Sequence, residues 1–511
     1  MTEAALPPLI QQMLQPEFYP HPVQEPVKLI QTHVSYVFLT GDFAYKVKKP
    51  VDFGFLNYST PEKRHFFCQE ELRLNRRGAP ELYLAVLPIY LSNDQFQLEE
   101  TGEPVEYLVK MRQFPQETLL TSLYDAGQLT DDMIVALAKK VSEFHAETVT
   151  NDYIRSFGEI AQIRPSFDEN YDQTENYIGG PQTQTQFDET RAYTDRFFAT
   201  QATLFQKRIA GDRIRECHGD LHLRNICYWN NEFYLFDCIE FNEPFRFVDV
   251  MFDIAYIVMD LQARDRPDLN ALFLNTYLEQ TGDWEGLQIL PLYVNRQSYV
   301  RAKVTSFLLD DPSISETDKQ TARETAAPYY KLAWEWTRPR QGKLWMMSGL
   351  SGSGKSTTAR QLARQLDAIH IRSDAVRKHL GGIPLNQRGG DDLYTPEMTQ
   401  KTYDRLLELG TLLAEQGYSV ILDAKYDRQA LREPVIKAAG DRQMPLTILH
   451  CNASEAVLHE RLTNRTGDIA DATADLLAKQ YLETFTKEEE SYVISLDTTQ
   501  PLEPQLAPLL P

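Results

Sequence analysis

The sequence predicts two domains, a first domain of α+β class and a second, α/β domain with a parallel sheet covered by helices on both faces. The chain of 511 residues is too long for one ordinary core. Strand patterns come first and give way to helical ones as far as Trp336, whereas strand and helix patterns alternate after Gly342. The helical pattern ends within Arg338–Gly342, which predicts domains at residues 1–338 and 343–511.

Composition narrows the class of protein. An apolar share of 42% and a charged share of 24% are ordinary for a chain with sizeable cores. The formal net charge of −21 repels a polyphosphate backbone, so nucleic acid is a disfavoured partner. The five cysteines show no C-x-x-C spacing, which favours a reducing compartment. Because neither a leader pattern nor a run of about 18 apolar residues occurs, we expect a cytoplasmic protein without a membrane segment.

The first domain begins with a predicted β-hairpin. Period-two alternation in His33–Leu39 and Phe43–Lys48 surrounds a Gly41-Asp42 turn. A helix is predicted over Pro61–Arg77, where proline stands near the start. Further patterns predict strands at Leu82–Leu91 and Glu106–Met111, helices at Asp131–Thr148, Thr190–Ile209 and from Val248 to Trp336, and an exposed polar loop at Gly179–Gln186.

Strands and helices alternate through the second domain. The predicted strands are Lys343–Leu350, Ala368–Ser373, Ser419–Asp423, Pro445–Cys451 and Tyr492–Leu496. The predicted helices are Lys355–Leu366, Pro396–Gln416, Arg428–Ala439 and Ser454–Arg465.

A phosphate-binding motif lies between the first strand and the first helix of the second domain. The pattern G-x-x-x-x-G-K-[ST] is satisfied by Gly349, Leu350, Ser351, Gly352, Ser353, Gly354, Lys355 and Ser356, and Thr357 follows it. The glycines let backbone N–H groups surround phosphate oxygens, Lys355 neutralises the β- and γ-phosphates, and Ser356 ligates Mg²⁺. A chance glycine-serine turn is the alternative, but the flanking strand and helix favour a site for ATP and Mg²⁺.

Phosphoryl transfer also needs a base and positive charge near the migrating group. Asp374 ends the second strand and is placed to act as the base, with Arg377 one helical turn further on. A helix-capping aspartate and a solvated arginine would give the same spacing. Asp423 ends the third strand, where a carboxylate can hold a Mg²⁺-bound water or the acceptor. The basic side chains that either contact the phosphates or solvate a helix face are Arg428, Arg432, Arg461 and Arg465, the last two ahead of a candidate lid at Thr466–Thr473.

These residues resemble those of the P-loop small-molecule kinases, a group that includes gluconate, shikimate and adenylate kinases, zeta toxins and polynucleotide 5′-kinases. The resemblance covers residues 343 to about 498. It implies transfer of the γ-phosphate of ATP to a small molecule. It further implies that Asp374 and Arg377 bind the acceptor and that the helix carrying Arg461 and Arg465 forms a lid over the nucleotide.

A second group of catalytic residue types lies in the first domain. The loop HGDLHLRN carries Asp220 and Asn225, and an apolar strand shortly afterwards ends in Asp237. Asp220 as the acceptor's base, with Asn225 and Asp237 as Mg²⁺ ligands, is the arrangement of protein-kinase-like phosphotransferases. The hairpin is expected to supply a lysine, for which we favour Lys46, held by Glu71 of the following helix. The alternative for this lysine is an exposed strand residue.

Other residues around this loop allow more than one interpretation. Lys48 lies on the same strand face as the favoured lysine. His218 and His222 have the i, i+4 spacing of zinc ligands, but the glycine between them disfavours a helix, so structural histidines are expected. Asp249 and Asp253 follow the loop and are predicted to support it.

The first domain resembles the aminoglycoside phosphotransferase and choline kinase-like superfamily through HGDLHLRN and the downstream Asp237. The order of the whole chain, YKVKKPVDFGFL and ELRLNRR followed by a P-loop domain, resembles bacterial bifunctional aminoglycoside phosphotransferase/ATP-binding proteins. This resemblance implies a protein-kinase-like bilobal fold, with a small β-rich lobe and a larger helical lobe, then a P-loop NTPase domain, and hence two nucleotide sites.

We therefore expect an enzyme with two ATP-dependent kinase modules that act on hydroxyl groups of small molecules, such as a sugar, an aminoglycoside or a related metabolite. One alternative leaves catalysis to the P-loop domain and gives the first domain a binding or regulatory role. Another is a 5′-hydroxyl polynucleotide kinase, which the Asp374 and Arg377 spacing favours and the net charge opposes. The sequence does not set an oligomeric state.

Overall fold

The computed structural model describes residues 6–465 and 467–510. Contacts divide the chain into two compact units. The first comprises residues up to 130, 143–169 and 198–260, and the second comprises 131–142, 170–197 and the chain from 261 onward. The second unit thus joins the P-loop sheet to helices that precede it, and the domain boundary at residues 338–343 stays a prediction.

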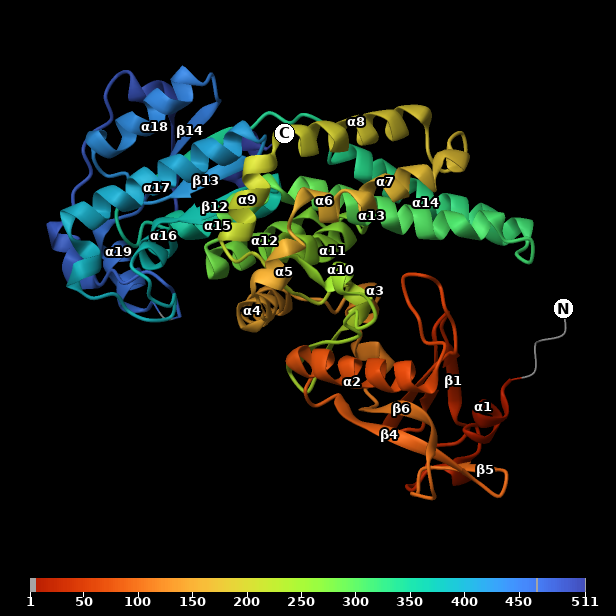
Figure 1. The fold of residues 1–511 in the computed structure, drawn as a ribbon. Coiled ribbons are helices and arrows are strands. Elements are labelled where there is room, and N and C mark those ends of the chain that lie inside the picture. Colours follow the sequence, from red (N-terminus) through yellow and green to blue (C-terminus); the bar gives the residue numbers. More distant parts are fainter. Residues whose placement is uncertain (1–5, 466, 511) are drawn as a thin grey trace. The chain divides into compact units, whose positions relative to one another are not determined.

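The first unit opens with a six-stranded antiparallel sheet in the order β1-β2-β3-β6-β4-β5, and α2 packs across β4 and β6 (Figure 1). The predicted hairpin is confirmed, with Val37 of β2 opposite Lys46 of β3. The side chain of Thr60 accepts a hydrogen bond from the backbone of Lys63 and so caps α2. The elements are α1 Pro8–Gln12, β1 Lys28–Gln31, β2 Ser35–Leu39, β3 Phe43–Lys48, α2 Pro61–Gly78, β4 Tyr83–Ser92, β5 Gln95–Gln97, β6 Pro104–Arg112 and α3 Leu120–Asp125.

Short strands and helices follow and frame the HGDLHLRN loop, which lies between β7 and β8. Strands β8 and β9 form a hairpin, and β10 pairs with β7. The elements are α4 Asp131–Glu147, α5 Asp152–Ser156, α6 Ile160–Ile163, α7 Pro165–Asp172, α8 Gln184–Thr200, α9 Ala202–Ala210, β7 Ile214–Glu216, β8 Ile226–Trp229, β9 Glu232–Leu235, α10 Glu243–Arg246, β10 Phe247–Asp249, α11 Val250–Ala263, α12 Pro267–Thr281, α13 Leu290–Ser306 and α14 Glu316–Glu335.

Two predictions in this part of the chain are wrong in detail. The stretch 179–186 is not wholly an exposed loop, because α8 begins at Gln184 and Gln182 is buried. Thr183 and Gln186 exchange hydrogen bonds between side chain and backbone, and such a reciprocal pair starts a helix. The helix expected over 190–209 is interrupted at Gln201, between α8 and α9.

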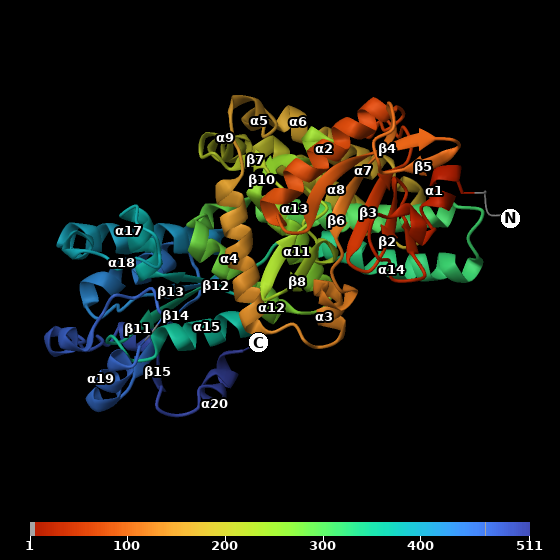
Figure 2. The same ribbon diagram turned by 90° about the horizontal axis from the view of Figure 1, so that it is seen from below.

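The second unit contains a five-stranded parallel sheet in the order β12-β13-β11-β14-β15. Figure 2 shows α17 and α18 on one face of this sheet and α15 on the other, as predicted for helices on both faces. Trp345, Met347, Ile421 and Leu449 belong to its buried core. The elements are β11 Lys343–Ser348, α15 Lys355–Leu366, β12 Ile369–Arg372, α16 Ser373–Leu380, α17 Pro396–Glu415, β13 Ser419–Asp423, α18 Gln429–Asp441, β14 Leu446–Asn452, α19 Glu455–Thr463, β15 Val493–Asp497 and α20 Glu503–Leu506.

Helix α12 covers the edge of this sheet. The side chain of Asn275 donates to the backbone oxygen of Ala368 at 2.8 Å and accepts from the backbone nitrogen of His370 at 2.7 Å. One amide thus satisfies a donor and an acceptor of the edge strand β12, as a neighbouring strand would. In residues 6–465 and 467–510, no helix has both the length and the hydropathy needed to cross a membrane.

Candidate active sites

The P-loop joins β11 to α15, and three of its positions have a backbone conformation that requires glycine. Gly349, Gly352 and Gly354 have φ angles of 141°, 82° and 88°. A Cβ on Gly349 would meet the backbone oxygen of Cys451 at 2.5 Å, so the loop lies directly on the end of β14. The chain therefore forms a tight backbone cradle at the N-terminus of α15, where N–H groups and the helix dipole favour anions.

A cavity of about 970 Å³ opens beside this cradle. Its lining draws on α16, β13 and the segment after α19 as well as on the P-loop. The predicted site residues that line it are Ser351, Gly352, Gly354, Lys355, Ser356, Thr357, Asp374, Arg377, Asp423, Arg428, Arg461 and Arg465. The structure thus brings the predicted donor and acceptor residues into one cavity, while Gly349, Leu350 and Ser353 complete the loop.

Lys355 lines this cavity, and its nearest contact is a backbone oxygen. Its Nζ donates to the backbone oxygen of Leu350 at 2.7 Å, and no ion pair to it occurs among the described residues. Burial lowers the pKa of Lys355, and the carboxyls of Asp423 and Asp374 only partly oppose that shift. An ammonium held in this way gains electrostatic energy when a polyanion enters the cavity.

Two carboxyls of the cavity have pKa values shifted in opposite directions. Burial raises the pKa of Asp374, and the neighbouring Asp423 raises it further against the opposing effect of Arg372. Burial alone would also raise the pKa of Asp423, but a hydrogen bond with His370 at 2.9 Å and the charge of Arg372 bring it below its usual range. Asp374 is therefore the better proton acceptor, and Asp423 the better permanent anion.

The predicted arginines have different roles in the structure. Arg377 is buried, donates to the backbone oxygen of Leu393 at 2.8 Å and lies 5.1 Å from the ring centre of Tyr394. Arg428 is half-exposed at the rim, whereas Arg432 is fully buried and pairs with Glu489 at 2.8 Å. Arg432 therefore stabilises the fold and does not face the cavity.

The helix predicted over Ser454–Arg465 does not carry Arg465, because α19 ends at Thr463. Arg461 donates to the backbone oxygen of Gly352 at 3.3 Å and to the side chain of Thr498 at 2.9 Å. It thereby ties the P-loop to the end of β15. The candidate lid begins at Thr466, a position outside the described residues.

Sequence reasoning gave no role to three charged groups near Asp374. Arg372, at the end of β12, is buried and lines the cavity. It pairs with Asp468 at 2.5 Å and with Glu279 of α12 at 3.6 Å. No local pattern could have joined these residues, because Glu279 and Arg372 lie on separate predicted helical and strand segments.

In the first unit, Lys46 of β3 contacts two carboxylates. Its Nζ lies 2.8 Å from Glu71 Oε1 and 2.8 Å from Asp237 Oδ1. Burial alone would raise the pKa of Asp237 and of Glu71, but Lys46 holds both below their usual ranges. The structure thus brings together the lysine, helix glutamate and aspartate that the sequence pairs. The alternative lysine, Lys48, is more deeply buried, with 1% of its side chain exposed against 14% for Lys46.

Asp220 and Asn225 face each other on the HGDLHLRN loop. The amide nitrogen of Asn225 donates to the backbone oxygen of Asp220 at 3.0 Å and to its Oδ2 at 3.3 Å. That orientation leaves the amide oxygen of Asn225 for a cation. Asp237 likewise uses Oδ1 for Lys46 and has a second oxygen, so the oxygen donors of this loop pair fit Mg²⁺.

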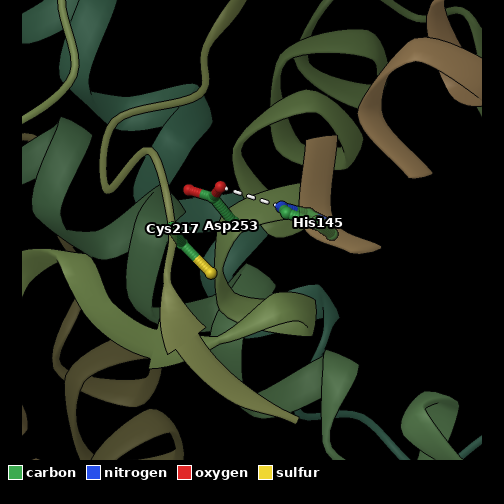
Figure 3. A group of neighbouring side chains, drawn as sticks. All are labelled: His145, Cys217 and Asp253. Carbon is green, nitrogen blue, oxygen red and sulfur yellow. Dashed lines mark hydrogen bonds and ion pairs between the residues drawn. The ribbon is translucent and has the colours of Figure 1, made fainter. Parts of the chain in front are cut away.

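The HGDLHLRN loop is supported by a carboxylate from α11. Asp253 accepts hydrogen bonds from the backbone nitrogens of His218 at 3.0 Å and Gly219 at 2.9 Å, which confirms its predicted support role. Figure 3 shows Asp253 beside His145 and Cys217, with the three ligand atoms within 4.8 Å of one another. Because both carboxylate oxygens of Asp253 already accept hydrogen bonds, one of them also from His145 at 3.0 Å, we interpret the group as a loop support and not as a metal site.

Two further predictions about this loop can be checked. The ring nitrogen Nε2 of His218 lies 2.9 Å from the backbone oxygen of Phe236, as expected for a structural histidine. Asp249 pairs with Arg208 of α9 at 2.6 Å, so it fixes the start of α11. Its support of the loop is therefore less direct than that of Asp253.

The chain thus combines an antiparallel sheet and the HGDLHLRN loop in its first unit with a P-loop at the end of a parallel sheet in its second. Residues 344–486 match the family described as an AAA domain. Among solved structures, a gluconokinase from Sinorhizobium meliloti is 25% identical, over 34% of this chain and 91% of that one, with a TM-score of 0.25. A choline/ethanolamine kinase family protein from Mesorhizobium loti is 9% identical, over 64% of this chain and 97% of that one, with a TM-score of 0.38.

Relatives that match most of the chain also exist. The uncharacterized proteins Rv2004c of Mycobacterium tuberculosis and Mb2027c of Mycobacterium bovis are each 30% identical over 464 residues, which is 90% of this chain and 90% of theirs. The chain belongs to the same family as these mycobacterial proteins.

Proposed function

We propose that the protein is an ATP-dependent kinase with two sites, each of which transfers the γ-phosphate of ATP to a hydroxyl group of a small molecule. The observation that carries the proposal is the cavity that Lys355 and Asp374 both line, where Lys355 forms no ion pair among the described residues and the pKa of Asp374 is raised. Lys46, Asp220, Asn225 and Asp237 support the same chemistry in the first unit.

In the P-loop cavity, the backbone cradle and Lys355 bind the phosphates of ATP. The acceptor oxygen forms a bond to the γ-phosphorus while the bond from that phosphorus to the β,γ-bridging oxygen breaks, and ADP leaves. Asp374 takes the proton of the acceptor hydroxyl, a role that its raised pKa favours. Mg²⁺, which the oxygens of Ser356 and Asp423 are suited to hold directly or through water, supplies charge neutralisation when bound.

In the first unit, Asp220 is the proposed base, and Asn225 and Asp237 are the proposed Mg²⁺ ligands. Lys46 is proposed to bind phosphate oxygens, and Glu71 to orient it until a nucleotide enters. The hydrogen bond from Asn225 fixes the Asp220 carboxylate and leaves its other oxygen for an acceptor proton. The acceptors of both sites are proposed to be hydroxylated metabolites such as sugars or amino-sugars, in a cytoplasmic protein that needs no nucleic acid partner.

A metabolite-library phosphorylation screen tests this proposal. Wild type, Lys355→Ala and Asp220→Ala are incubated in parallel with ATP and Mg²⁺, and phosphorylated products are read by mass spectrometry. Lys437→Ala, which removes an exposed lysine of α18, serves as a matched control. We expect each active-site variant to lose one set of products and the control to lose none.

Other outcomes separate the alternatives. Loss of every product in Lys355→Ala, with none lost in Asp220→Ala, would favour a regulatory or binding role for the first unit. Phosphorylation of a 5′-hydroxyl oligonucleotide that requires Lys355 and weakens steeply with salt would favour a polynucleotide kinase. A full set of products from both variants would contradict the two-site proposal.

A further inference from the structure

Two lysines on β3 share one carboxylate of α2. Lys46 contacts Oε1 of Glu71 at 2.8 Å, and Lys48 contacts Oε2 of the same side chain at 2.5 Å. Because the lysines stand two residues apart on a strand, both side chains point to the same face. Phosphate binding, as proposed above, needs only one of them, so the second lysine requires its own explanation.

Lys48 has more buried partners than Lys46. Its Nζ also pairs with Glu240, and Tyr58 donates its hydroxyl hydrogen to that same carboxylate. Lys48, Tyr58 and Glu71 are at most 1% exposed, and Glu240 is 6% exposed. Burial alone would lower the pKa of Lys48, but Glu240 and Glu71 raise it above its usual value, so Lys48 stays charged.

The two carboxylates that contact Lys46 differ in how easily they can release it. The side chain of Asp237 is 49% exposed, so water can replace the ammonium there at little cost. Glu71 is fully buried, and a buried carboxylate that lost its only counter-ion would be strongly destabilised. If Lys46 were the sole cation at Glu71, its movement toward phosphate oxygens would therefore be opposed.

We propose that Lys48 is a positioning residue that keeps Glu71 neutralised, so that Lys46 can leave both Glu71 and Asp237 and bind the phosphates of ATP. Glu240 and Tyr58 hold Lys48 in place for this role. The inference rests on the nucleotide site proposed for the first unit and adds to it a division of labour between the two lysines. Lys46 moves, and Lys48 does not.

The test measures equilibrium binding of Mg²⁺ and AMP-PNP, a non-hydrolysable ATP analogue, by calorimetry on the full chain. Lys355→Ala is the background for all variants, so that the P-loop contributes little binding. Lys48→Met is expected to weaken binding about tenfold or more, because Lys46 is then retained by Glu71. Lys48→Arg keeps the charge and is expected to restore binding to within about threefold of the background.

Glu240→Gln tests the hold on Lys48. It removes one of the two carboxylates that position Lys48 but leaves the ion pair with Glu71, so binding is expected to weaken, by less than in Lys48→Met. Lys49→Met is the matched control, since Lys49 is the neighbouring lysine and its Nζ contacts the backbone oxygen of Thr32 at 2.6 Å and the ring of Tyr36, not a carboxylate, among the described residues. Thermal midpoints are recorded for each variant.

The outcomes are distinguishable. A purely structural role would lower the thermal midpoints of Lys48→Met and Glu240→Gln together and leave the affinity of the folded fraction unchanged, which would overturn the inference. Equal affinities for Lys48→Met and Lys48→Arg would overturn it as well. If Asp220→Ala removes turnover while Lys48→Met binds normally, the kinase proposal survives and this inference fails. If the Lys355→Ala background binds no nucleotide, both the nucleotide site proposed for the first unit and the role of Lys48 are wrong.

Discussion

The two candidate nucleotide sites keep their lysines in opposite states. Lys355 of the P-loop donates to a backbone oxygen and forms no ion pair among the described residues, whereas Lys46 lies between two carboxylates. The P-loop presents a finished backbone cradle, while the first unit has to exchange one ion pair for another when a nucleotide enters. A preformed site with a single lysine is expected to lose more activity when that lysine is removed. A site in which several charged groups share the role is expected to lose less activity for each residue removed.

The largest effect is expected for Lys355→Ala. With the first unit silenced by Asp220→Ala, we expect turnover at the P-loop to fall roughly 1,000-fold, because the only cation facing the phosphates from the cradle is lost. ADP formation with an acceptor found in the screen measures it, and Lys437→Ala serves as the control. A fall of less than tenfold would mean that the cradle is not the nucleotide site.

The next largest effect is expected for Asp374→Asn, roughly 100-fold on the same turnover. In the parent, the rate should rise with pH as Asp374 loses its proton, and its raised pKa moves that rise above the pH typical of an aspartate. A carboxyl whose pKa is raised by folding removes stability as pH increases through that value. Asp374→Asn should therefore also raise the thermal midpoint at neutral pH, and a lowered midpoint would argue against the raised pKa.

A smaller effect, roughly 10- to 100-fold, is expected for Lys46→Met in the first unit, measured in the Lys355→Ala background. The loss of one charge-assisted hydrogen bond changes the rate by about this factor, and Glu71 still has Lys48 as its counter-ion in the variant. Lys49→Met is the control. An effect as large as that of Lys355→Ala would remove the contrast between the two sites.

The smallest effect is expected for Asp253→Asn, which replaces an acceptor by an amide facing two backbone N–H groups. We expect a loss of about 1–3 kcal/mol in the free energy of unfolding of the first unit, followed by urea denaturation. Asp125→Asn, an exposed aspartate of the same unit, should change it little. If Zn²⁺ stabilised the parent against unfolding but did not stabilise the variant, Asp253, His145 and Cys217 would form a metal site.

What could be predicted from the sequence is what lies close together along it. The P-loop is one contiguous motif, and HGDLHLRN with Asp237 spans a single hairpin, so spacing alone placed these residues. The alternating patterns likewise predicted the parallel sheet, with strand ends displaced by one or two residues.

The rest depends on contacts between distant segments. The pairing of Lys48 with Glu240 joins residues 192 positions apart. Arg432 has the spacing of a solvated helix residue, and only tertiary packing buries it against Glu489. The end of α19 before Arg465 was missed although Asn464, which directly follows Thr463, is a residue type that often ends helices.

The way α12 covers β12 determines where the chain can be cut. A fragment that starts at Lys343 looks complete by sequence, yet it would lack Asn275 and expose the backbone N–H and C=O groups of an outermost strand. Unprotected strand edges recruit other strands, so such a fragment is expected to self-associate and precipitate on expression. Strand β12 leads directly into α16, which carries Asp374. Without α12 the proposed base would therefore be held less firmly in position.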